Sequence, residues 1–407
     1  MKAREIKPNV YWVGAVDWNL RNFHGYSTDK GSSYNAYLII DEKITLVDTV
    51  KYHLVDEMIE RIKSVIDPAK IDYVISNHVE MDHSGGLPAI MKLLSSKSTT
   101  LFTSVNGEKG LKNHYHSNST NNCSNWNFKK VVAGDSISLG KYTVKFIPTP
   151  MVHWPDSMIS YIPELKLLLP NDAFGQHIAS ASLYEDEVGW DIVKMEAAKY
   201  YANIVLPYGK NVQSVLKSVS EQNLAIDMIA PSHGVILRTN TSIEKMIHLY
   251  QKWSSYTADD NKAVIVYDTM WGSTEKMAHA IKSFFEEKMV ATKMISLSHT
   301  HISDAMTDIM EAKYVLIGSP TLNNTIMPTV GALLTYMKGL RPTKKIGFAF
   351  GSFGWSGQSV KHIEEALREL EFEMPVAATA SAAASIKYIP TNDDLENLKR
   401  SLHSLVR

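Results

Sequence analysis

The chain has 407 residues, which is too long for one ordinary hydrophobic core and suggests two or three domains. Lys and Arg total 42 against 43 Asp and Glu, so the net charge of -1 gives no electrostatic reason to expect a nucleic-acid or anionic-membrane partner. The single cysteine, Cys123, excludes disulfide frameworks, four-cysteine zinc sites and cysteine-ligated iron–sulfur clusters within one chain.

The N-terminal segment MKAREIKPNVYW does not have the charged and apolar regions of a signal peptide. The longest apolar runs, such as Ala263–Tyr267, are far too short to span a membrane. We therefore expect a cytoplasmic protein.

Residues 1–250 are expected to form strands joined by loops, with a few helices. The sequence predicts strands over Val10–Val16 and Tyr34–Ile40, where β-branched and aromatic residues are frequent, and a hairpin partner over Lys43–Asp48. Apolar residues at helical spacing predict a helix over His53–Ile66. A short apolar strand, Ile71–Ser76, then leads directly into the segment NHVEMDHSGG.

Beyond this segment the sequence predicts a helix over Gly86–Leu94 and strands over Tyr142–Pro148 and Leu165–Leu169. The range 95–127 is polar, rich in Asn and Ser, and has little periodicity.

From Ala263 onward, short apolar strands (AVIVYD, YVLIGS, KIGFAFGS) alternate with helical segments such as Glu275–Met289 and Ser359–Leu370. This alternation is typical of βαβ units and a parallel sheet. The small-residue run Ala377–Ser385 is interpreted as an ordinary strand and turn. A polar stretch without pattern precedes Ala263, so we expect a first domain at residues 1–252, a linker at 253–261 and a second domain at 262–407.

Four potential metal ligands, His78, Glu80, Asp82 and His83, follow a predicted strand within six residues. Side chains alternate along an extended chain, so we expect His78, Glu80 and Asp82 to point to the same side, with a loop at the following Ser-Gly-Gly. The alternative is a polar surface loop, but such a loop rarely carries four ligand-type side chains at this spacing.

This segment resembles the metal-binding motif His-x-His-x-Asp-His of the metallo-β-lactamase fold, with Glu80 in place of the second histidine. That substitution, and the order of motifs over nearly the whole chain, are similar to the flavodiiron proteins, also called A-type flavoproteins. The resemblance implies a combined α+β and α/β fold, in which a metallo-β-lactamase-like αββα sandwich precedes a flavodoxin-like, doubly wound parallel sheet. Mixed imidazole and carboxylate ligands also suit redox-active non-haem iron better than zinc.

The resemblance further implies that His153, Asp172 and His233 complete the metal site. The family pattern divides the ligands between two irons: His78, Glu80 and His153 on the first, Asp82, His83 and His233 on the second, and Asp172 bridging. The ligand at the His83 position is not coordinated in every member. Taken singly, His233 before a glycine reads as a turn residue, and Asp172 as a turn residue or helix cap.

The family also places further groups over the open face of the metals, where they donate hydrogen bonds or protons to bound oxygen. The candidates in this chain are His24, Tyr26 and His177. The equally weighted alternative for each is a partly exposed polar residue of a loop.

A second constellation lies in three loops that follow strands of the C-terminal domain. The first, TMWGST at 269–274, combines hydroxyl groups, a glycine and a helix N-terminus, which together suit a phosphate dianion. It has neither the lysine of a P-loop nor a G-x-G-x-x-G pattern, and it resembles the phosphate loop of flavodoxins. An unliganded helix cap is the alternative.

The other two loops, SPTLNN at 319–324 and SFGWSG at 352–357, also leave the carboxyl ends of parallel strands, where such sheets bind ligands. Trp271 and Trp355 are candidates to stack on the flavin ring, with surface packing as the alternative. The expected FMN contacts are Thr269, Met270, Gly272, Ser273, Thr274, Pro320, Thr321, Asn323, Ser352, Phe353, Gly354, Trp355, Ser356 and Gly357.

Together, the two sites imply an oxidoreductase in which FMN passes electrons to two irons that reduce dioxygen to water. In the family the FMN of one subunit lies beside the metals of its partner, so we expect a head-to-tail homodimer or a dimer of dimers. The strings VYWVGAVDWNLRNFHGY, HWPDSM, NDAFGQH and YDTMWGSTEKMAHAI are similar to methanogen members that oxidise reduced coenzyme F-420, which we therefore expect as the donor.

Three other functions stay open. The first is a nitric oxide or oxygen reductase fed by rubredoxin, and because the chain has no paired CxxC motifs we expect no fused rubredoxin. The second is a zinc hydrolase of the metallo-β-lactamase type, against which Glu80 argues. The third is an electron carrier whose N-terminal half is structural.

Overall fold

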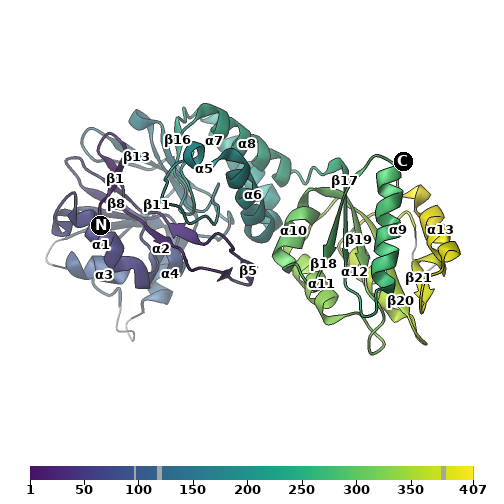
Figure 1. Ribbon diagram of the computed structural model, residues 1–407. Coiled ribbons are helices and arrows are strands. Elements are labelled where there is room, and N and C mark those ends of the chain that lie inside the picture. Colours follow the sequence, from purple (N-terminus) through teal and green to yellow (C-terminus); the bar gives the residue numbers. More distant parts are fainter. Residues whose placement is uncertain (96–97, 117–121, 377–381, 407) are drawn as a thin grey trace. The chain divides into compact units, whose positions relative to one another are not determined.

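The computed structural model describes residues 1–95, 98–116, 122–376 and 382–406, and it divides into two compact units (Figure 1). The first unit comprises Met1–His24, Thr28–Tyr200 and Lys210–Gln251, and the second comprises Gly25–Ser27, Tyr201–Gly209 and Lys252–Arg407. Within the described ranges, no helix combines the length and the apolar character that crossing a bilayer requires.

Two β-sheets form the centre of the first unit. The larger sheet has the strand order β1-β2-β7-β8-β9-β10-β11 and contains β1 (Arg4–Lys7), β2 (Val10–Trp12), β7 (Tyr37–Ile39), β8 (Thr45–Val47), β9 (Tyr73–Ser76), β10 (Thr100–Ser104) and β11 (Asn127–Val131). The other sheet runs in sequence order and contains β12 (Ser136–Ser138), β13 (Thr143–Pro148), β14 (Met158–Ile162), β15 (Leu167–Leu169) and β16 (Met228–Ile229). The hairpin expected at Lys43–Asp48 is present, because β7 and β8 pair antiparallel.

Most helices of the N-terminal half are short, and α7 and α8 are the longest of them. They are η1 (Tyr52–Leu54), α1 (Val55–Lys63), η2 (Pro68–Lys70), α2 (Met81–Ser84), α3 (Leu87–Leu93), α4 (Val105–His114), η3 (Pro163–Leu165), α5 (Glu185–Val188), α6 (Trp190–Tyr200), α7 (Gly209–Glu221) and α8 (Asn240–Ser254). A π-helix, η4 (Tyr201–Val205), and a 3-10 turn, η5 (Leu206–Tyr208), follow α6 and pack with the second unit.

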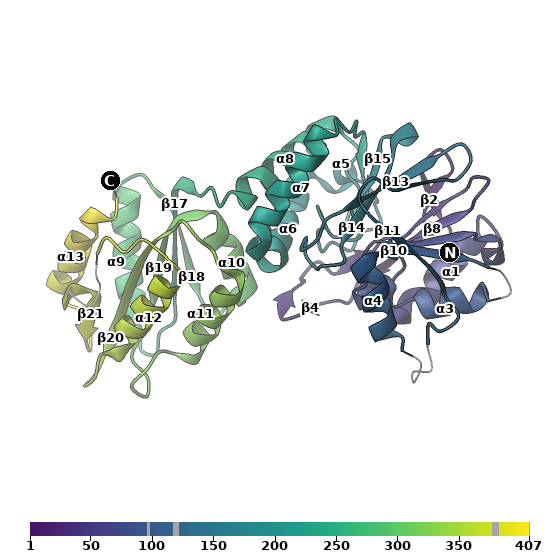
Figure 2. The same cartoon turned by 180° about the vertical axis from the view of Figure 1, so that it is seen from behind.

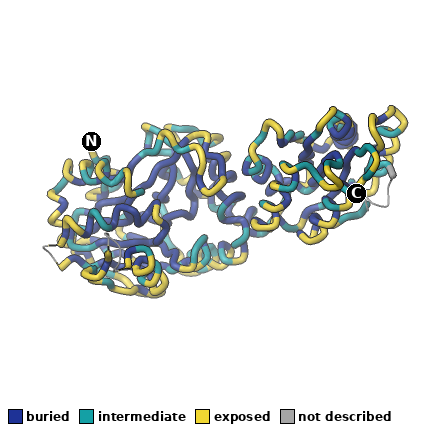
Figure 3. Tube along the Cα trace, turned by 90° about the horizontal axis from the view of Figure 1, so that it is seen from below, coloured by how far each residue is buried: buried dark blue, intermediate teal, exposed yellow. Residues whose placement is uncertain are grey.

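The core of the first unit has four layers. Residues of the larger sheet such as Trp12 and Phe102 pack against residues of the other sheet such as Phe146 and Leu167. The opposite face of the larger sheet packs against α1, α3 and α4 through a second apolar cluster. Helices α7 and α8 face the outer side of the other sheet (Figure 2). The expected αββα sandwich is confirmed, and Figure 3 shows buried segments in the interior with exposed segments around them.

Two strands that the sequence predicts as continuous are each divided. The range Val10–Val16 splits into β2 and β3 (Ala15–Asp17), and Tyr34–Ile40 splits into β6 (Ser32–Tyr34) and β7. The break lies where the two segments cross, because Gly14 approaches the backbone of residue 34 so closely that a Cβ would lie 2.2 Å from its oxygen. Beyond this point β3 and β6 pair with each other as a separate ribbon.

The range 95–127, whose sequence shows little periodicity, contains β10 and α4 within its described residues. Only Gly107 and Leu111 of α4 are buried, so the helix leaves almost no apolar periodicity in the sequence. The remaining short strands of this half are β4 (Asn22–Phe23) and β5 (Tyr26–Ser27), and β5 belongs to the second unit.

The second unit is built on one parallel sheet with the order β18-β17-β19-β20-β21. Its strands are β17 (Asp259–Tyr267), β18 (Ala291–Ser296), β19 (Ala312–Gly318), β20 (Ile346–Phe353) and β21 (Ser385–Lys387). The connecting helices are α9 (Ser273–Glu287), α10 (Ile302–Glu311), α11 (Pro328–Leu340), α12 (Gln358–Glu369) and α13 (Asn392–Ser401), with the turns η7 (Ala382–Ala384) and η8 (Leu402–Ser404).

Helices α9 and α13 pack together on one face of this sheet, and α10 and α11 pack together on the other (Figure 1). The doubly wound flavodoxin-like architecture is therefore confirmed. Regular structure enters the expected linker from both sides, since α8 ends at Ser254 and β17 begins at Asp259. Of the run Ala377–Ser385, residues 377–381 lie outside the described residues, and β21 begins at Ser385.

One lysine of this unit is buried at the start of β20. Lys345 is 2% exposed, and its Nζ donates a hydrogen bond to the carbonyl oxygen of Met310 at 2.6 Å. Burial lowers the pKa of Lys345 from 10.5 to about 7, because the interior disfavours the charged amine.

This burial predicts a pH-dependent stability. Between pH 7 and about pH 10 the unfolded chain binds one more proton at Lys345 than the folded chain, so stability rises with pH by up to about 1.4 kcal/mol per unit. Lys345→Met should remove this contribution, as measured by urea denaturation across that range. The adjacent, exposed Lys344→Met is the control, and an unchanged pH dependence in Lys345→Met would contradict the prediction.

Candidate metal centre and flavin cavity

The predicted ligands of the first unit gather into two groups. One consists of His78, Glu80, His153 and Asp172, and the other of Asp82, His83 and His233. Within each group the ligand atoms lie within 4.8 Å of one another. Of these seven residues, six are buried and His153 is nearly so. These are the two sets that the family pattern gives, although their role as metal ligands stays a prediction.

The ligands come from loops at the ends of strands in both sheets. His78 and Glu80 follow β9, His153 lies between β13 and β14, Asp172 follows β15 and His233 follows β16. Polar side chains can gather at these strand ends, because loops that follow strands lie outside the apolar core.

The segment around Glu80 differs from the expectation of an extended run and a loop. The chain is extended as far as Glu80, and α2 then begins at Met81, with the amides of His83 and Ser84 donating to the Glu80 carbonyl. This turn directs Asp82 and His83 into the second group, away from His78. The prediction that Asp82 points to the same side as His78 is therefore wrong. The loop expected at Ser-Gly-Gly begins one residue later, because Ser84 is the last residue of α2.

Asp172 joins the two groups through its two carboxylate oxygens. Oδ2 lies 3.1 Å from His153 Nε2 and 3.6 Å from His78 Nε2. Oδ1 lies 2.9 Å from His83 Nε2 and 3.4 Å from His233 Nε2. One carboxylate thus faces both sets of imidazoles, which is the arrangement that a bridging ligand requires.

Charges in the cluster are mutually compensated. Burial would raise the pKa of Glu80, but hydrogen bonds with His153, His24 and His78 hold it well below its usual range. Burial would likewise lower the pKa of His83, but the charges of Asp82 and Asp172 raise it to about 9. Without a metal, Glu80 is therefore ionised and His83 protonated at neutral pH, and a metal bound by His83 must displace a proton.

The donor set fits a pair of transition-metal ions. Both oxygens of Asp82 are buried without a well-oriented hydrogen-bond donor among the described residues, although His233 Nε2 lies 3.2 Å from Oδ2. Buried acceptors left in this state are rare unless an ion or water completes them. Three carboxylates and four imidazoles are also the mixed oxygen and nitrogen set that redox-active iron prefers.

Two of the three candidates for the open face lie at this cluster. His24 Nε2 is 2.7 Å from Glu80 Oε1, while its side chain is 70% exposed. His177 is buried, its ring lies 4.9 Å from that of His233, and its Nδ1 is 2.7 Å from Ser32 Oγ. Tyr26 is buried in β5 and packs with the second unit, so its role at the metals stays a prediction.

Several supporting residues were not foreseen from the sequence. Ser232 Oγ donates to Asp172 Oδ1 at 2.7 Å, and His233 Nδ1 lies 2.8 Å from the carbonyl oxygen of Ser33. Asp48 accepts hydrogen bonds from Asn77 and Asn171, the residues that precede His78 and Asp172. Serines, asparagines and isolated aspartates are too common for such partners to stand out in one sequence.

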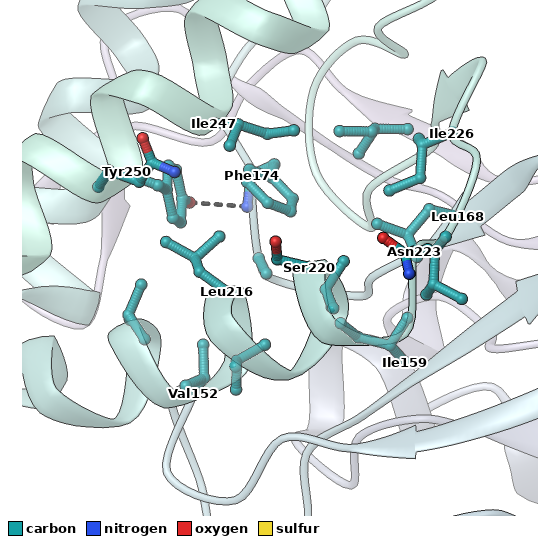
Figure 4. Close-up of a pocket in the computed structure, with 17 residues that line it drawn as sticks. Val152, Ile159, Leu168, Phe174, Leu216, Ser220, Asn223, Ile226, Ile247 and Tyr250 are labelled. Atoms are coloured by element: carbon teal, nitrogen blue, oxygen red, sulfur yellow. Dashed lines mark hydrogen bonds between the residues drawn. The ribbon is translucent and has the colours of Figure 1, made fainter.

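The loop after Asp172 is held from behind by α8. Phe174 has a left-handed backbone with φ of 67°, and its amide donates to the hydroxyl of Tyr250 at 2.7 Å (Figure 4). An apolar cavity of about 370 Å³ adjoins this bond, between α7, α8 and the outer face of β14 and β15. Val152 and Ala173, neighbours in sequence of His153 and Asp172, form part of its lining.

The second unit carries a cavity of about 880 Å³ at the carboxyl ends of β17, β19 and β20. Its volume is that of a cofactor site. Ten of the predicted flavin contacts line it: Met270, Ser273, Pro320, Thr321, Asn323, Ser352, Phe353, Gly354, Trp355 and Ser356. Four do not, namely Thr269, Gly272, Thr274 and Gly357.

Three of these four residues shape the loops. Gly272 has φ of 82° and caps α9, and its amide donates to Thr269 Oγ1 at 3.0 Å, which closes the first loop on itself. Buried Thr274 Oγ1 lies 3.0 Å from Ser352 Oγ and so joins the first loop to the third. The amides at the start of α9 beside this hydroxyl-rich loop suit a phosphate group.

Aromatic and apolar side chains surround the mouth of the cavity. Trp271 and Trp355 are 93% and 89% exposed, so their rings are accessible to a planar ligand. The sequence did not single out Leu322, Tyr388 or Ile389, which also line the cavity. Tyr388 and Ile389 follow the short edge strand β21, far along the chain from the three loops.

Comparison with known proteins agrees with this geometry. Residues 33–234 match the family described as ODP family beta lactamase, and residues 265–399 match flavodoxin. A nitric oxide reductase of Moorella thermoacetica is 44% identical over 96% of this chain and 95% of its own length. The structure of rubredoxin oxygen:oxidoreductase from Desulfovibrio gigas has a TM-score of 0.93 at 40% identity, covering 100% of this chain and 98% of that one. The structure of the flavodiiron protein from Giardia intestinalis has a TM-score of 0.90 at 33% identity, covering 98% and 95%.

The bond between α8 and the Asp172 loop generates a stability prediction. Tyr250→Phe leaves the buried amide of Phe174 without an acceptor and should lower the free energy of unfolding by about 1–3 kcal/mol. Urea denaturation measures the loss, with the exposed Tyr52→Phe as the matched control. Equal stability of Tyr250→Phe and the unchanged protein would show that the hydrogen bond does not hold the loop.

The exposed rings generate a prediction about flavin affinity. Trp355→Ala removes an aromatic face and the apolar area that this ring would bury on binding FMN. This variant should bind FMN at least about tenfold more weakly. Quenching of flavin fluorescence during titration of the flavin-free protein measures this change. Trp18→Ala, an exposed tryptophan of the first unit, should bind FMN normally. An equal loss in both variants would contradict the stacking role.

Proposed function

The chain belongs to the flavodiiron protein family, and on that premise we propose that it reduces dioxygen or nitric oxide with electrons delivered through FMN. FMN and a two-iron centre are the cofactors of such an oxidoreductase, and the residues of this chain fit both. The observation that carries the proposal is the carboxylate of Asp172, whose two oxygens face two separate sets of nitrogen and oxygen ligands.

When bound, FMN takes up electrons in pairs and releases them singly, and the irons bind and reduce a diatomic gas. The chain's own residues hold these centres and manage charge. Glu80, Asp82 and Asp172 place three negative charges beside two cations, which offsets most of the positive charge brought into the interior. A site built on imidazoles alone would not do so.

Protons must also reach the site, because reduction of dioxygen to water consumes four of them. His24 suits this role, since its exposed ring reaches solvent while its Nε2 contacts Glu80. The hydrogen bond with Glu80 raises the pKa of His24, so the ring keeps its proton to a higher pH than a free imidazole does. We propose that His24 passes protons to the site beside Glu80. We also propose that buried His177 donates a hydrogen bond to the bound gas.

The gas is proposed from the relatives. One similar protein is named a nitric oxide reductase and another a rubredoxin oxygen:oxidoreductase, so both gases are supported. We place dioxygen first, because two ferrous ions and one reduced FMN together hold the four electrons that dioxygen needs. A zinc hydrolase has less support, because Glu80 joins the cluster and both named relatives are redox enzymes.

Two electron donors are proposed, in this order. A separate rubredoxin has the support of the Desulfovibrio gigas relative, whose name states that donor. Reduced coenzyme F-420 has the support of the local sequence strings alone. The cytoplasmic location and the absence of a nucleic-acid partner stay predictions.

A head-to-tail homodimer is proposed as the working assembly. Its support within one chain is the exposed apolar rim of the flavin cavity, formed by Met270, Trp271, Trp355 and Ile389. Contiguous apolar surface of this kind normally meets a partner. A second copy of the chain is the partner that the family arrangement implies.

The proposed function is tested by pairing each donor with each gas. The holoenzyme is mixed anaerobically with reduced rubredoxin or reduced F-420, and flavin bleaching and consumption of dioxygen or nitric oxide are then recorded. We expect rubredoxin to support dioxygen consumption. Glu80→Ala should keep flavin reduction and lose at least about 100-fold in gas consumption, since even supporting residues of a metal site affect activity up to that extent. Gas consumption unchanged in Glu80→Ala would contradict the proposal.

A further inference from the structure

A carboxylate outside both ligand groups contacts His78 from behind. Asp156 lies in the loop between β13 and β14 and is 4% exposed. Its Oδ2 lies 2.9 Å from Nδ1 of His78 and accepts the amide hydrogen of Val79 at 2.8 Å. The other ring nitrogen of His78, Nε2, faces Glu80 and Asp172 at 3.4 and 3.6 Å.

The loop that carries this carboxylate is anchored by hydrogen bonds that do not involve the histidine. Ser104, at the end of β10, donates its hydroxyl to the carbonyl oxygen of Asp156 at 2.7 Å and also caps α4. Asn106 donates to the carbonyl oxygen of Pro155 at 3.1 Å. The loop is therefore anchored to β10 and α4, neither of which supplies a predicted ligand. The ring of His78 takes the orientation that its contact with Asp156 allows.

The contact determines the form of the imidazole. A neutral imidazole carries one N–H, and the nitrogen that donates to a carboxylate leaves the other with a lone pair. Because the amide of Val79 also donates to Oδ2, this oxygen is an acceptor, and the proton between it and His78 belongs to Nδ1. When metal binding displaces the second proton of the ring, the lone pair of His78 lies on Nε2, which points into the ligand group.

We propose that Asp156 is a positioning residue, which holds His78 in the Nδ1-protonated tautomer and directs Nε2 toward the first metal. This inference rests on the proposed ligation of a metal by His78. Carboxylate–histidine–metal arrangements orient the ring and raise its basicity as a ligand.

The two histidines of the second ligand group are held differently. His233 Nδ1 lies against a backbone carbonyl, that of Ser33, at 2.8 Å. Nδ1 of His83 is buried without a hydrogen-bond partner among the described residues. A hydrogen bond to a charged acceptor is stronger than one to a neutral carbonyl. Loss of Asp156 should therefore affect the metal held by His78 and leave the metal of the other group in place.

The test measures metal binding and does not depend on gas reduction. Metal-free protein is titrated with cobalt(II), whose visible absorption reports the ligand geometry of each bound ion. We expect Asp156→Ala to weaken one of the two cobalt ions by about 10- to 100-fold and Asp156→Asn, which keeps one acceptor, to weaken it less. The exposed Asp227→Asn serves as the matched control.

A double-mutant cycle separates positioning from general loss of structure. In a His78→Ala background, Asp156→Ala should cause no further loss of cobalt affinity, because the ring that it orients is absent. Nitrogen NMR of the zinc-loaded protein should show Nδ1–H on His78 in the unchanged protein and lose that signal in Asp156→Ala.

Three outcomes would overturn the inference. An equal loss with and without His78, or an equal weakening of both ions, would assign Asp156 a purely structural role. Unchanged cobalt binding in Asp156→Ala would show that it has no role at the metal. Failure of the unchanged protein to bind two cobalt ions would instead contradict the metal centre itself, and with it the proposed function.

Discussion

Three carboxylates and four imidazoles share one buried space in this protein, and their mutual compensation is the constraint on which the rest of the first unit depends. An isolated buried charge costs several kcal/mol, so none of these groups is tolerable alone. In the structure these opposite charges lie close together, and Asp172 contacts the imidazoles of both groups. Strand ends from two sheets must therefore converge on one point, and the αββα sandwich is the scaffold that brings them there.

The same constraint explains why supporting residues come from elements far apart in sequence. A ligand loop with unusual backbone angles keeps its shape only if its free polar groups are satisfied from outside. Tyr250 of α8 does this for Phe174, and Asp48 does it for the two asparagines beside His78 and Asp172. The loops that carry the predicted ligands are thus held by hydrogen bonds from residues outside the two ligand groups.

Much of this organisation could be predicted from the sequence, and what could not has physical reasons. The cluster His78 to His83 was visible because four ligand types fall within six residues, and the three flavin loops because each follows a strand. The separation of Asp82 from His78 could not be foreseen, since it depends on α2 beginning at Met81. Asp156 and Tyr388 carry no local signal, because their importance arises only when distant segments meet. Strands β2 and β3 were merged for a similar reason, as their division depends on how closely Gly14 approaches another segment.

The exposed indoles of Trp271 and Trp355 have a consequence for how the protein behaves under light. If FMN stacks on these rings as predicted, it absorbs where tryptophan emits, and their emission would pass to the flavin by energy transfer whenever the cavity is filled. Intrinsic fluorescence therefore offers an optical gauge of cofactor loading in unlabelled protein. The same proximity would let these rings donate electrons to an illuminated flavin. Purification in daylight would therefore oxidise the tryptophans at these two positions.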